Sequence, residues 1–128
     1  MRSLTLTGLG RVSWDVAAEH PSALDFLLAA LATDLVSGLG EECRRAGLQL
    51  EDVELRLEAF LESPLVVAGV VGEKGSPRVR EIRGSLYVQS VSGDELLRAA
   101  WRRAREKSPV LASLALDVAI DIALKHVI

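Results

Sequence analysis

The chain is poor in cysteine and in aromatic residues, and both shortages narrow the range of folds open to it. Cys43 is the only cysteine among 128 residues, so no intrachain disulfide can form and the framework of a small disulfide-rich secreted protein is excluded. Phe, Trp and Tyr make up only 4% of the residues, so leucine, valine and alanine must build the core. With 49% hydrophobic and 26% charged residues, the composition is that of a globular protein.

An excess of basic charge and long apolar runs are also absent. The net charge of −3 argues against a nucleic-acid partner. The densest basic stretch, Arg98 to Lys107, has helical spacing and indicates a solvated helix face, with a phosphate or nucleic-acid site as the alternative. No apolar run reaches the ~20 residues of a membrane span, and the first residues contain no apolar signal core. We therefore expect one cytoplasmic domain over residues 1–128, without a membrane segment.

The most regular hydrophobic pattern predicts a long helix from Pro21 to Gly47. Proline suits the first position of a helix, and glycine is a common residue just after its end. Leucines recur at helical spacing while alanine, phenylalanine and valine fill the other faces. A helix that is apolar nearly all round is expected to be central and buried, although 128 residues hardly suffice to cover it on every face. One acid, Asp34, interrupts this apolar stretch.

Three other segments show the alternation that is typical of strands. Residues 53–61 predict a half-buried antiparallel strand, residues 80–91 predict another, and residues 4–16 predict one or two short strands joined by a glycine turn. The uncharged run 65–71 is compatible with a strand, a loop or a segment that faces a partner.

The last third of the chain predicts an amphipathic helix and a final strand. The helix opens at Gly93-Asp94, with Asp94 as its cap, and ends at Ser108-Pro109, because a residue before proline disfavours helix. A short apolar turn at 110–114 follows, and the alternation in 118–128 favours a strand over a helix. Antiparallel strands segregated from helices place the chain in the α+β class.

The order of these elements resembles the family of osmotically-inducible-protein-C-like (OsmC-like) proteins. In that family a proline and a leucine- and alanine-rich helix lead to a cysteine, and two strands, an amphipathic helix, a Cys-Pro step and a terminal strand follow. Here Ala23 to Asp34 supplies the helix and Ser108-Pro109 the step, and the resemblance covers His20 to Ile128. It implies an OsmC-like fold, with antiparallel sheets around a long central buried helix, in an intertwined homodimer with two sites at the interface.

The resemblance also implies a chemistry for which this chain lacks the residues. In the family one cysteine attacks an organic hydroperoxide as a thiolate, and a second cysteine then forms a disulfide with it. By position these cysteines correspond to Asp34 and Ser108, and neither side chain can perform the reaction. The family's pocket arginine has one candidate here, Arg11. We expect no catalytic residue and no cofactor, but a non-peroxidatic homodimer that binds a small hydrophobic ligand at its interface or has a structural role.

Two alternatives from other functional classes remain open. The first is an enzyme of the oxidative stress response, either a peroxiredoxin-like, thiol-dependent organic hydroperoxide reductase that uses Cys43 or a catalyst of an acid-dependent reaction at Asp34. Cys43 lies nine residues after Asp34, on the opposite side of a helix, and Glu41 and Glu42 beside it would raise its pKa, which favours an incidental thiol. The second is an α+β interaction module unrelated to the family.

Asp34 is the most informative single residue, because aspartate is seldom fully buried without a partner. It is either a site acid whose pKa burial perturbs, or an acid that pairs with an arginine such as Arg11 or faces water. We expect Asp34 and Ser108 to lie close together at the dimer interface. His20 and His126 share no ligand spacing with other residues, so we expect no metal site.

Overall fold

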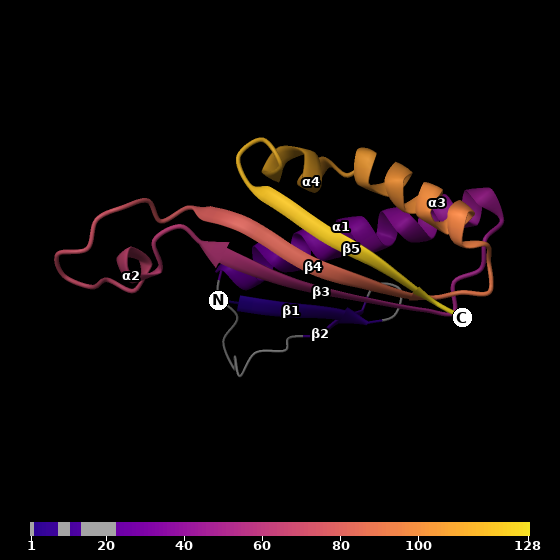
Figure 1. The fold of residues 1–128 in the computed structure, drawn as a ribbon, viewed down its shortest axis with the longest axis horizontal. Helices are drawn as coiled ribbons and strands as arrows, with labels where there is room; N and C mark the ends of the chain where they lie inside the picture. The colour runs from indigo at the N-terminus through magenta and orange to yellow at the C-terminus, as the bar shows by residue number, and fades with distance from the viewer. Residues whose placement is uncertain (1, 8–10, 14–22) are drawn as a thin grey trace.

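The computed structural model describes residues 2–7, 11–13 and 23–128, in which helices cover one face of a five-stranded sheet (Figure 1). The strand order is β2-β1-β3-β4-β5. The strands are β1 Arg2–Thr7, β2 Arg11–Ser13, β3 Asp52–Leu61, β4 Val79–Gln89 and β5 Ala119–Val127. The helices are α1 Ala23–Ala46, α2 Pro64–Val67, α3 Asp94–Glu106 and α4 Pro109–Leu114. The α+β class and the two short N-terminal strands are confirmed, while the glycines of the predicted turn lie outside the described residues.

The direction of the last strand corrects the prediction of purely antiparallel sheets. The pairs β1–β2, β1–β3 and β3–β4 are antiparallel, but β5 runs parallel to β4, and all of them belong to one mixed sheet. The reason is the connection: the chain leaves β4, crosses the sheet face through α3 and α4, and returns to the end at which β4 began (Figure 1). A hairpin reverses the direction of a strand, whereas a helical crossover preserves it.

The central helix α1 packs its leucines against the sheet. Leu28, Leu31, Leu35 and Leu39 are fully buried, and the helix is followed by Gly47, whose φ of 71° favours glycine. As expected from the length of the chain, one copy does not cover the helix on every face, because the sheet and α3 enclose only part of its circumference. Exposed residues follow one another at helical spacing along α1: Ala23, Phe26, Ala30, Thr33 and Ser37. We call these five residues the exposed stripe.

Helix α1 is also long and apolar enough to cross a membrane by length and composition alone. The core helix of a soluble protein passes the same test, so this property is weak evidence for a span. Its fully buried leucines join the core cluster that β3 and β4 also supply, which is the arrangement of a core helix.

The half-buried antiparallel strand predicted for residues 53–61 is confirmed as β3. Val53, Leu55 and Leu57 are fully buried, while the intervening Glu54 and Arg56 face away from the core. Strand β4 pairs with β3 through the centre of the sheet, and Gly84 lies opposite Leu57. A Cβ atom at Gly84 would lie 2.4 Å from the carbonyl oxygen of Arg56, so only glycine fits at this crossing without a backbone shift.

The segment between β3 and β4 extends beyond the end of the sheet (Figure 1). It contains the short helix α2 and then a loop, so the strand alternative for residues 65–71 is wrong. Its apolar side chains are exposed, and Val71 is 99% exposed. We call residues 62–78 the apolar arm.

The C-terminal elements follow the prediction with two corrections. The amphipathic helix and the final strand are confirmed as α3 and β5. Gly93, not Asp94, is the residue at the N-cap, because the Asp94 carboxylate is engaged by Arg98 and His126 instead. The predicted turn at 110–114 is the helix α4, which starts because Ser108 caps it and Pro109 occupies its first turn.

Candidate functional site

Asp34 and Ser108, the two residues at the positions of the family's cysteines, are in direct contact. The Ser108 hydroxyl donates a hydrogen bond to Asp34 Oδ2 over 2.5 Å, although the residues are 74 positions apart in the chain. Asp34 lies in the middle of α1, and Ser108 lies between α3 and α4. The fold therefore brings these two positions together through the docking of the α3–α4 connection on α1.

Both side chains serve the N-terminus of α4. Ser108 Oγ accepts a hydrogen bond from the backbone N–H of Leu111 over 3.1 Å, and Asp34 Oδ2 accepts one from the backbone N–H of Val110 over 3.2 Å. Two of the N–H groups that every helix leaves unpaired at its start are thus satisfied. The negative charge of Asp34 also complements the positive end of the helix dipole. The pair is a helix-capping arrangement that spans two parts of the chain.

This geometry limits the chemistry that the pair can perform. Ser108 is 3% exposed, so its hydroxyl cannot reach a substrate in solution. The hydroxyl proton is directed at Asp34, and no histidine contacts either residue among those described. Neither a thiolate nor a disulfide is available at these positions. The arrangement therefore stabilises a helix and lacks the groups of a nucleophilic or redox centre.

A shallow groove between α1 and α3 passes beside this pair. It has a volume of about 280 Å³. Its lining consists of Asp34, Ser37, Gly38, Glu41, Glu42, Arg45, Ala104, Lys107 and Ser108. At its floor the two helices approach closely, because a Cβ atom on Gly38 would lie 3.5 Å from the Ala104 Cβ. Charged and hydroxyl-bearing side chains line most of the groove.

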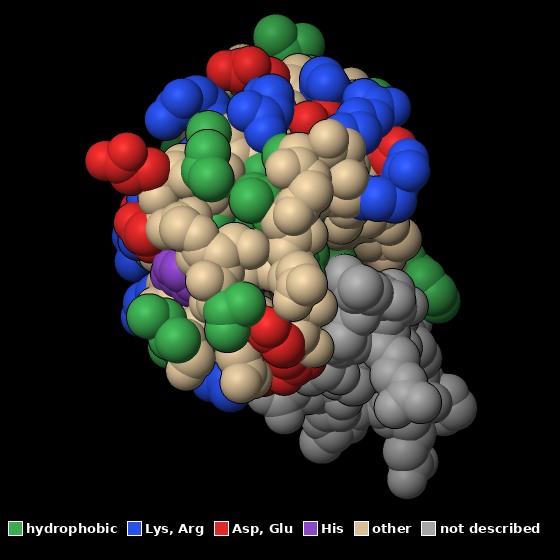
Figure 2. Space-filling view, turned by 90° about the vertical axis from the view of Figure 1, so that its right-hand side faces the viewer, with side chains coloured by type: hydrophobic (Ala, Val, Ile, Leu, Met, Phe, Trp, Pro, Cys, Tyr) green, Lys and Arg blue, Asp and Glu red, His purple; other side chains and the backbone are tan. Residues whose placement is uncertain are grey.

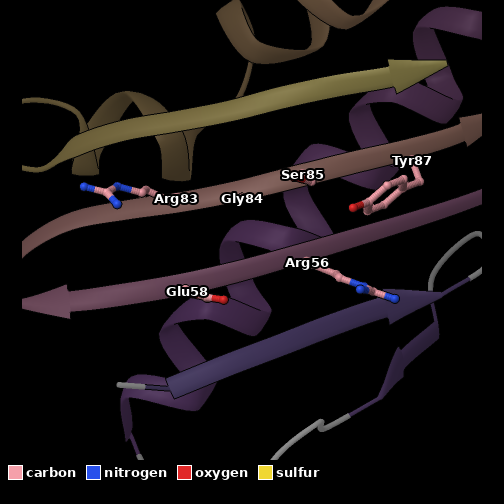
Figure 3. Close-up of a pocket in the computed structure, with 6 residues that line it drawn as sticks. All are labelled: Arg56, Glu58, Arg83, Gly84, Ser85 and Tyr87. Carbon is pink, nitrogen blue, oxygen red and sulfur yellow. The ribbon is translucent and has the colours of Figure 1, made fainter.

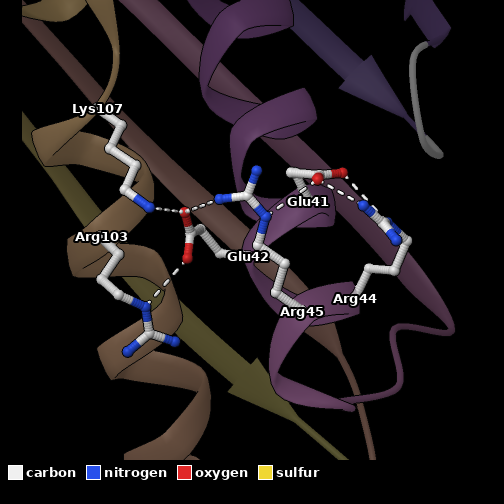
Figure 4. A network of polar contacts seen from close by, with 6 residues as sticks. All are labelled: Glu41, Glu42, Arg44, Arg45, Arg103 and Lys107. Atoms are coloured by element: carbon white, nitrogen blue, oxygen red, sulfur yellow. Dashed lines mark hydrogen bonds and ion pairs between the residues drawn. The ribbon is translucent and has the colours of Figure 1, made fainter.

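At the other end of the groove one buried carboxylate holds the two helices together (Figure 4). Glu42 is 5% exposed, and it accepts hydrogen bonds from Lys107 Nζ over 2.6 Å and from Arg103 Nε over 3.1 Å. The hydrogen bond from Lys107, aided by Arg103, lowers the pKa of Glu42 despite its burial. Basic and acidic side chains alternate over this end of the molecule, as Figure 2 shows.

The sequence pattern contains a signal for the buried position of Glu42. Glu42 lies three residues after Leu39 and seven after Leu35, so it continues the buried face of α1. A charged residue at such a position needs a cationic partner. The basic stretch supplies it: Arg103 and Lys107 stay 42% and 58% exposed on the solvated face that the sequence indicates, and their charged ends reach Glu42.

Cys43 lies in the core. Its side chain is 1% exposed, and burial raises its pKa, with Glu42 acting in the same direction and Arg103 opposing. The predicted direction of the shift is confirmed, but burial and not the neighbouring carboxylates is the main cause. A thiol that is buried and protonated is a poor nucleophile.

The structure describes the remaining candidate residues to different extents. The backbone of Arg11 lies in β2, at the sheet edge opposite β5, while His20 lies outside the described residues. His126 is near the end of β5, where its ring nitrogens contact Asp94 and the Ser90 carbonyl. Within residues 2–7, 11–13 and 23–128, no three His, Cys, Asp or Glu side chains are grouped so that they could hold a metal ion.

A second hollow lies on the face of the sheet that the helices leave open (Figure 3). Its two arginines are already paired along their own strands: Arg56 contacts Glu54, and Arg83 contacts Glu81. The two guanidinium groups also lie over aromatic rings, Arg56 over Tyr87 at 5.5 Å. Figure 3 shows Arg56 and Arg83 pointing away from each other, with Glu58 of β3 and Gly84 and Ser85 of β4 between them. This face has the features of a solvated sheet surface.

Comparisons with solved structures identify the fold. An OsmC-like protein from Mycoplasma pneumoniae is superimposable with a TM-score of 0.71 at 11% identity, over 97% of this chain and 96% of that one. The organic hydroperoxide resistance protein OhrB of Bacillus subtilis gives a TM-score of 0.56 at 14% identity, over 98% of each chain. A Legionella pneumophila organic hydroperoxide resistance protein OsmC gives 0.57 at 18% identity, over 88% of this chain and 74% of that one.

Sequence comparison gives the same answer. No curated protein matches the chain. The sequence model of the family described as OsmC-like protein, however, matches residues 16–123, which include α1, both central strands, α3 and the Asp34–Ser108 contact. The resemblance drawn from the order of elements is thereby confirmed, and the chain belongs to the OsmC-like proteins.

Proposed function

We propose that this protein is a non-peroxidatic member of its family, which acts in the cytoplasm as a homodimer that binds a small ligand or has a structural role. The observation that carries the proposal is the hydrogen bond between Asp34 and Ser108. It occupies the two positions at which the family's redox pair is expected and uses both side chains to cap α4.

The chemistry of hydroperoxide reduction explains why this substitution matters. A thiolate attacks one peroxide oxygen, the O–O bond breaks, and the alcohol leaves with a proton while the sulfur becomes a sulfenic acid. A second thiol then displaces water from that sulfenic acid and forms a disulfide. Asp34 has no sulfur to oxidise, and Ser108 cannot resolve a sulfenic acid. Both half-reactions therefore lack their reacting group.

The alternative function is a thiol-dependent organic hydroperoxide reductase with Cys43 as the nucleophile. The solved relatives from Bacillus subtilis and Legionella pneumophila are named for organic hydroperoxide resistance, which favours it. The burial of Cys43 and its raised pKa argue against it. With one cysteine in the chain, this alternative also requires a second thiol from an external reductant.

We expect no turnover of an organic hydroperoxide above the rate of the uncatalysed reaction when the protein is supplied with dithiothreitol or a lipoyl dithiol. The assay follows the loss of cumene hydroperoxide, with Cys43→Ser as the matched variant. Equal rates for the wild type, the variant and the buffer support the proposal. Turnover by the wild type that Cys43→Ser abolishes would establish the alternative instead.

The proposal of a homodimer has two supporting observations. The first is the exposed stripe of α1, which leaves one face of an otherwise apolar helix in contact with water. The second is the apolar arm, in which Leu65 and Val67 are each 52% exposed at the end of the molecule where the arm extends. A second copy that covers both surfaces would remove apolar area from water, which is the main driving force of obligate association.

We expect light scattering to give twice the monomer mass of 13.8 kDa at micromolar concentration. Val71→Asp, in the apolar arm, is expected to weaken the dimer, because burial of an unpaired carboxylate is costly. Asp121→Asn on the open face of the sheet is a control that should leave the mass unchanged. A wild-type mass of one chain would contradict the proposal.

The proposed hydrophobic ligand belongs at this dimer interface and not in the groove beside Asp34. The groove is lined by the charged residues Asp34, Glu41, Glu42, Arg45 and Lys107, so an apolar molecule there would desolvate charges without replacing their partners. The exposed stripe offers alanine and phenylalanine side chains instead. A ligand that fills the groove itself would have to be small and polar.

A further inference from the structure

The imidazole of His126 is enclosed at the C-terminal end of β5. Its side chain is 7% exposed, and both ring nitrogens have close partners. Nδ1 lies 2.9 Å from Asp94 Oδ1 in the first turn of α3, and Nε2 lies 2.8 Å from the carbonyl oxygen of Ser90, just after β4.

The two partners determine which form of the ring fits this site. A carboxylate and a backbone carbonyl both accept hydrogen bonds, and neither can donate one. A neutral imidazole has one N–H group and one lone pair, so it can satisfy only one of the two partners and must direct its lone pair at the other. The imidazolium ion has two N–H groups and satisfies both. The site is therefore complementary to the protonated ring alone.

The balance of hydrogen bonds and charges around the ring also favours the imidazolium ion. Asp94 and Arg98 of α3 are the charged groups that act on His126, and they have opposite signs. Arg98 Nε donates to the other oxygen of Asp94 over 2.8 Å, and its Nη1 lies 3.5 Å from the Leu124 carbonyl. The hydrogen bonds to Ser90 and Asp94 raise the pKa of His126, and burial and Arg98 oppose them only in part.

The acceptors are themselves held in place, so they cannot easily move away from a neutral ring. The backbone N–H of Ser90 donates to the Val127 carbonyl over 3.0 Å, and the Ser90 hydroxyl donates to the Gln49 carbonyl. Ser92 Oγ accepts from the N–H of Gln49 over 3.0 Å. His126 thus joins the end of an edge strand to a fixed turn and to the start of a helix.

We propose that His126 is a pH-sensitive clasp, which as an imidazolium ion fastens the C-terminal end of β5 to the start of α3 and which releases that end when it loses its proton. Strand β5 is suited to such control because it lies at the edge of the described sheet, with β4 as its only strand partner there. Release would affect the last residues of β5 before the rest of the sheet.

The direction of the pH dependence follows from proton linkage. The folded pKa of His126 lies above the value of 6.5 for a free histidine, so the clasp contributes its full stabilisation below pH 6.5 and loses it as the pH rises through the folded pKa. The pKa of Asp94 is lowered, chiefly by Arg98 and then by His126, so its contribution is lost only in acid. The end of β5 should therefore be most firmly held in mildly acidic solution.

An NMR titration of the wild-type protein tests the state of the ring without any change to it. Long-range ¹H–¹⁵N spectra distinguish the imidazolium ion from both neutral tautomers, and His20→Gln assigns the second histidine. We expect His126 to be doubly protonated at pH 6.5 and to titrate above that value. A midpoint at or below pH 6.5, or a neutral ring at pH 6, would overturn the proposal.

Hydrogen exchange of the backbone amides tests the release. We expect the opening constant of Leu124 to Val127, after division by the intrinsic exchange rate, to rise about tenfold for each pH unit between pH 6.5 and the folded pKa and then to level off. The amides of β3 should show no such rise, and in His126→Gln, which does not titrate, the rise should vanish. The same pH profile in that variant, or the same rise in β3, would overturn the proposal.

Discussion

Replacing Asp34 with leucine is expected to lower the free energy of unfolding by about 3 kcal/mol, the scale of hydrogen bonds to a charged acceptor. Asp34 accepts from the Ser108 hydroxyl and from the Val110 N–H, and leucine would leave both donors without this acceptor. From the sequence alone, the substitution could raise or lower the free energy of unfolding, since leucine would stabilise the protein if the acid were unpaired. Because Asp34 accepts both hydrogen bonds in the structure, we expect the substitution to destabilise the protein. Urea unfolding followed by circular dichroism measures the change.

Two further variants separate this effect from the propensity of leucine for helix. Arg102→Leu places the same residue on the exposed face of α3, outside the proposed interface, and should change stability by less than about 0.5 kcal/mol. Asp34→Asn retains one acceptor oxygen, so its free energy of unfolding should lie between those of the wild type and Asp34→Leu. If Asp34→Leu were as stable as the wild type, Asp34 would not support the start of α4.

Introducing cysteine at both positions is expected to produce a disulfide. The double variant Asp34→Cys with Ser108→Cys, built on Cys43→Ser so that no other thiol is present, should lose two thiols on mild oxidation. The reason is that the native side chains already touch, 2.5 Å apart between Oδ2 and Oγ. A bond that closes a loop of this length, between positions 74 apart, should stabilise the oxidised over the reduced variant by about 4 kcal/mol.

Intact mass and a thiol count measure the bond, and unfolding with and without reductant measures its effect. Asp34→Cys alone, on the same background, should remain a free thiol within each chain. A double variant that retains both thiols after oxidation, or that links two chains and not one, would show that positions 34 and 108 do not stand where the family's pair is expected.

Much of the fold was predictable because local patterns and tertiary structure agree. The alternation from Val53 to Ala59 became β3, and the leucines from Leu28 to Leu39 became the buried face of α1. Gly47 ends that helix in the conformation that glycine favours. The contact between Asp34 and Ser108 was also expected, although only through the resemblance to the family, since nothing local in either segment indicates the other.

The features that were not predicted depend on pairing between distant segments. The parallel direction of β5 follows from the crossover through α3 and α4, which no alternation of residues encodes. The short helix α4 was read as a turn because its cap includes Asp34, which is remote in sequence. Incomplete cover of α1 was expected from the length of the chain, but composition does not show which of its residues form the exposed stripe.

We propose that this chain performs no peroxide chemistry. The most direct test is the mass of the intact folded protein after exposure to an organic hydroperoxide in the presence of dimedone, which traps sulfenic acids. Cys43 is the only thiol in the chain, and it is 1% exposed. We predict no adduct on the folded protein, with an adduct in denaturant as the positive control. A stoichiometric dimedone adduct on Cys43 of the folded protein would contradict the account.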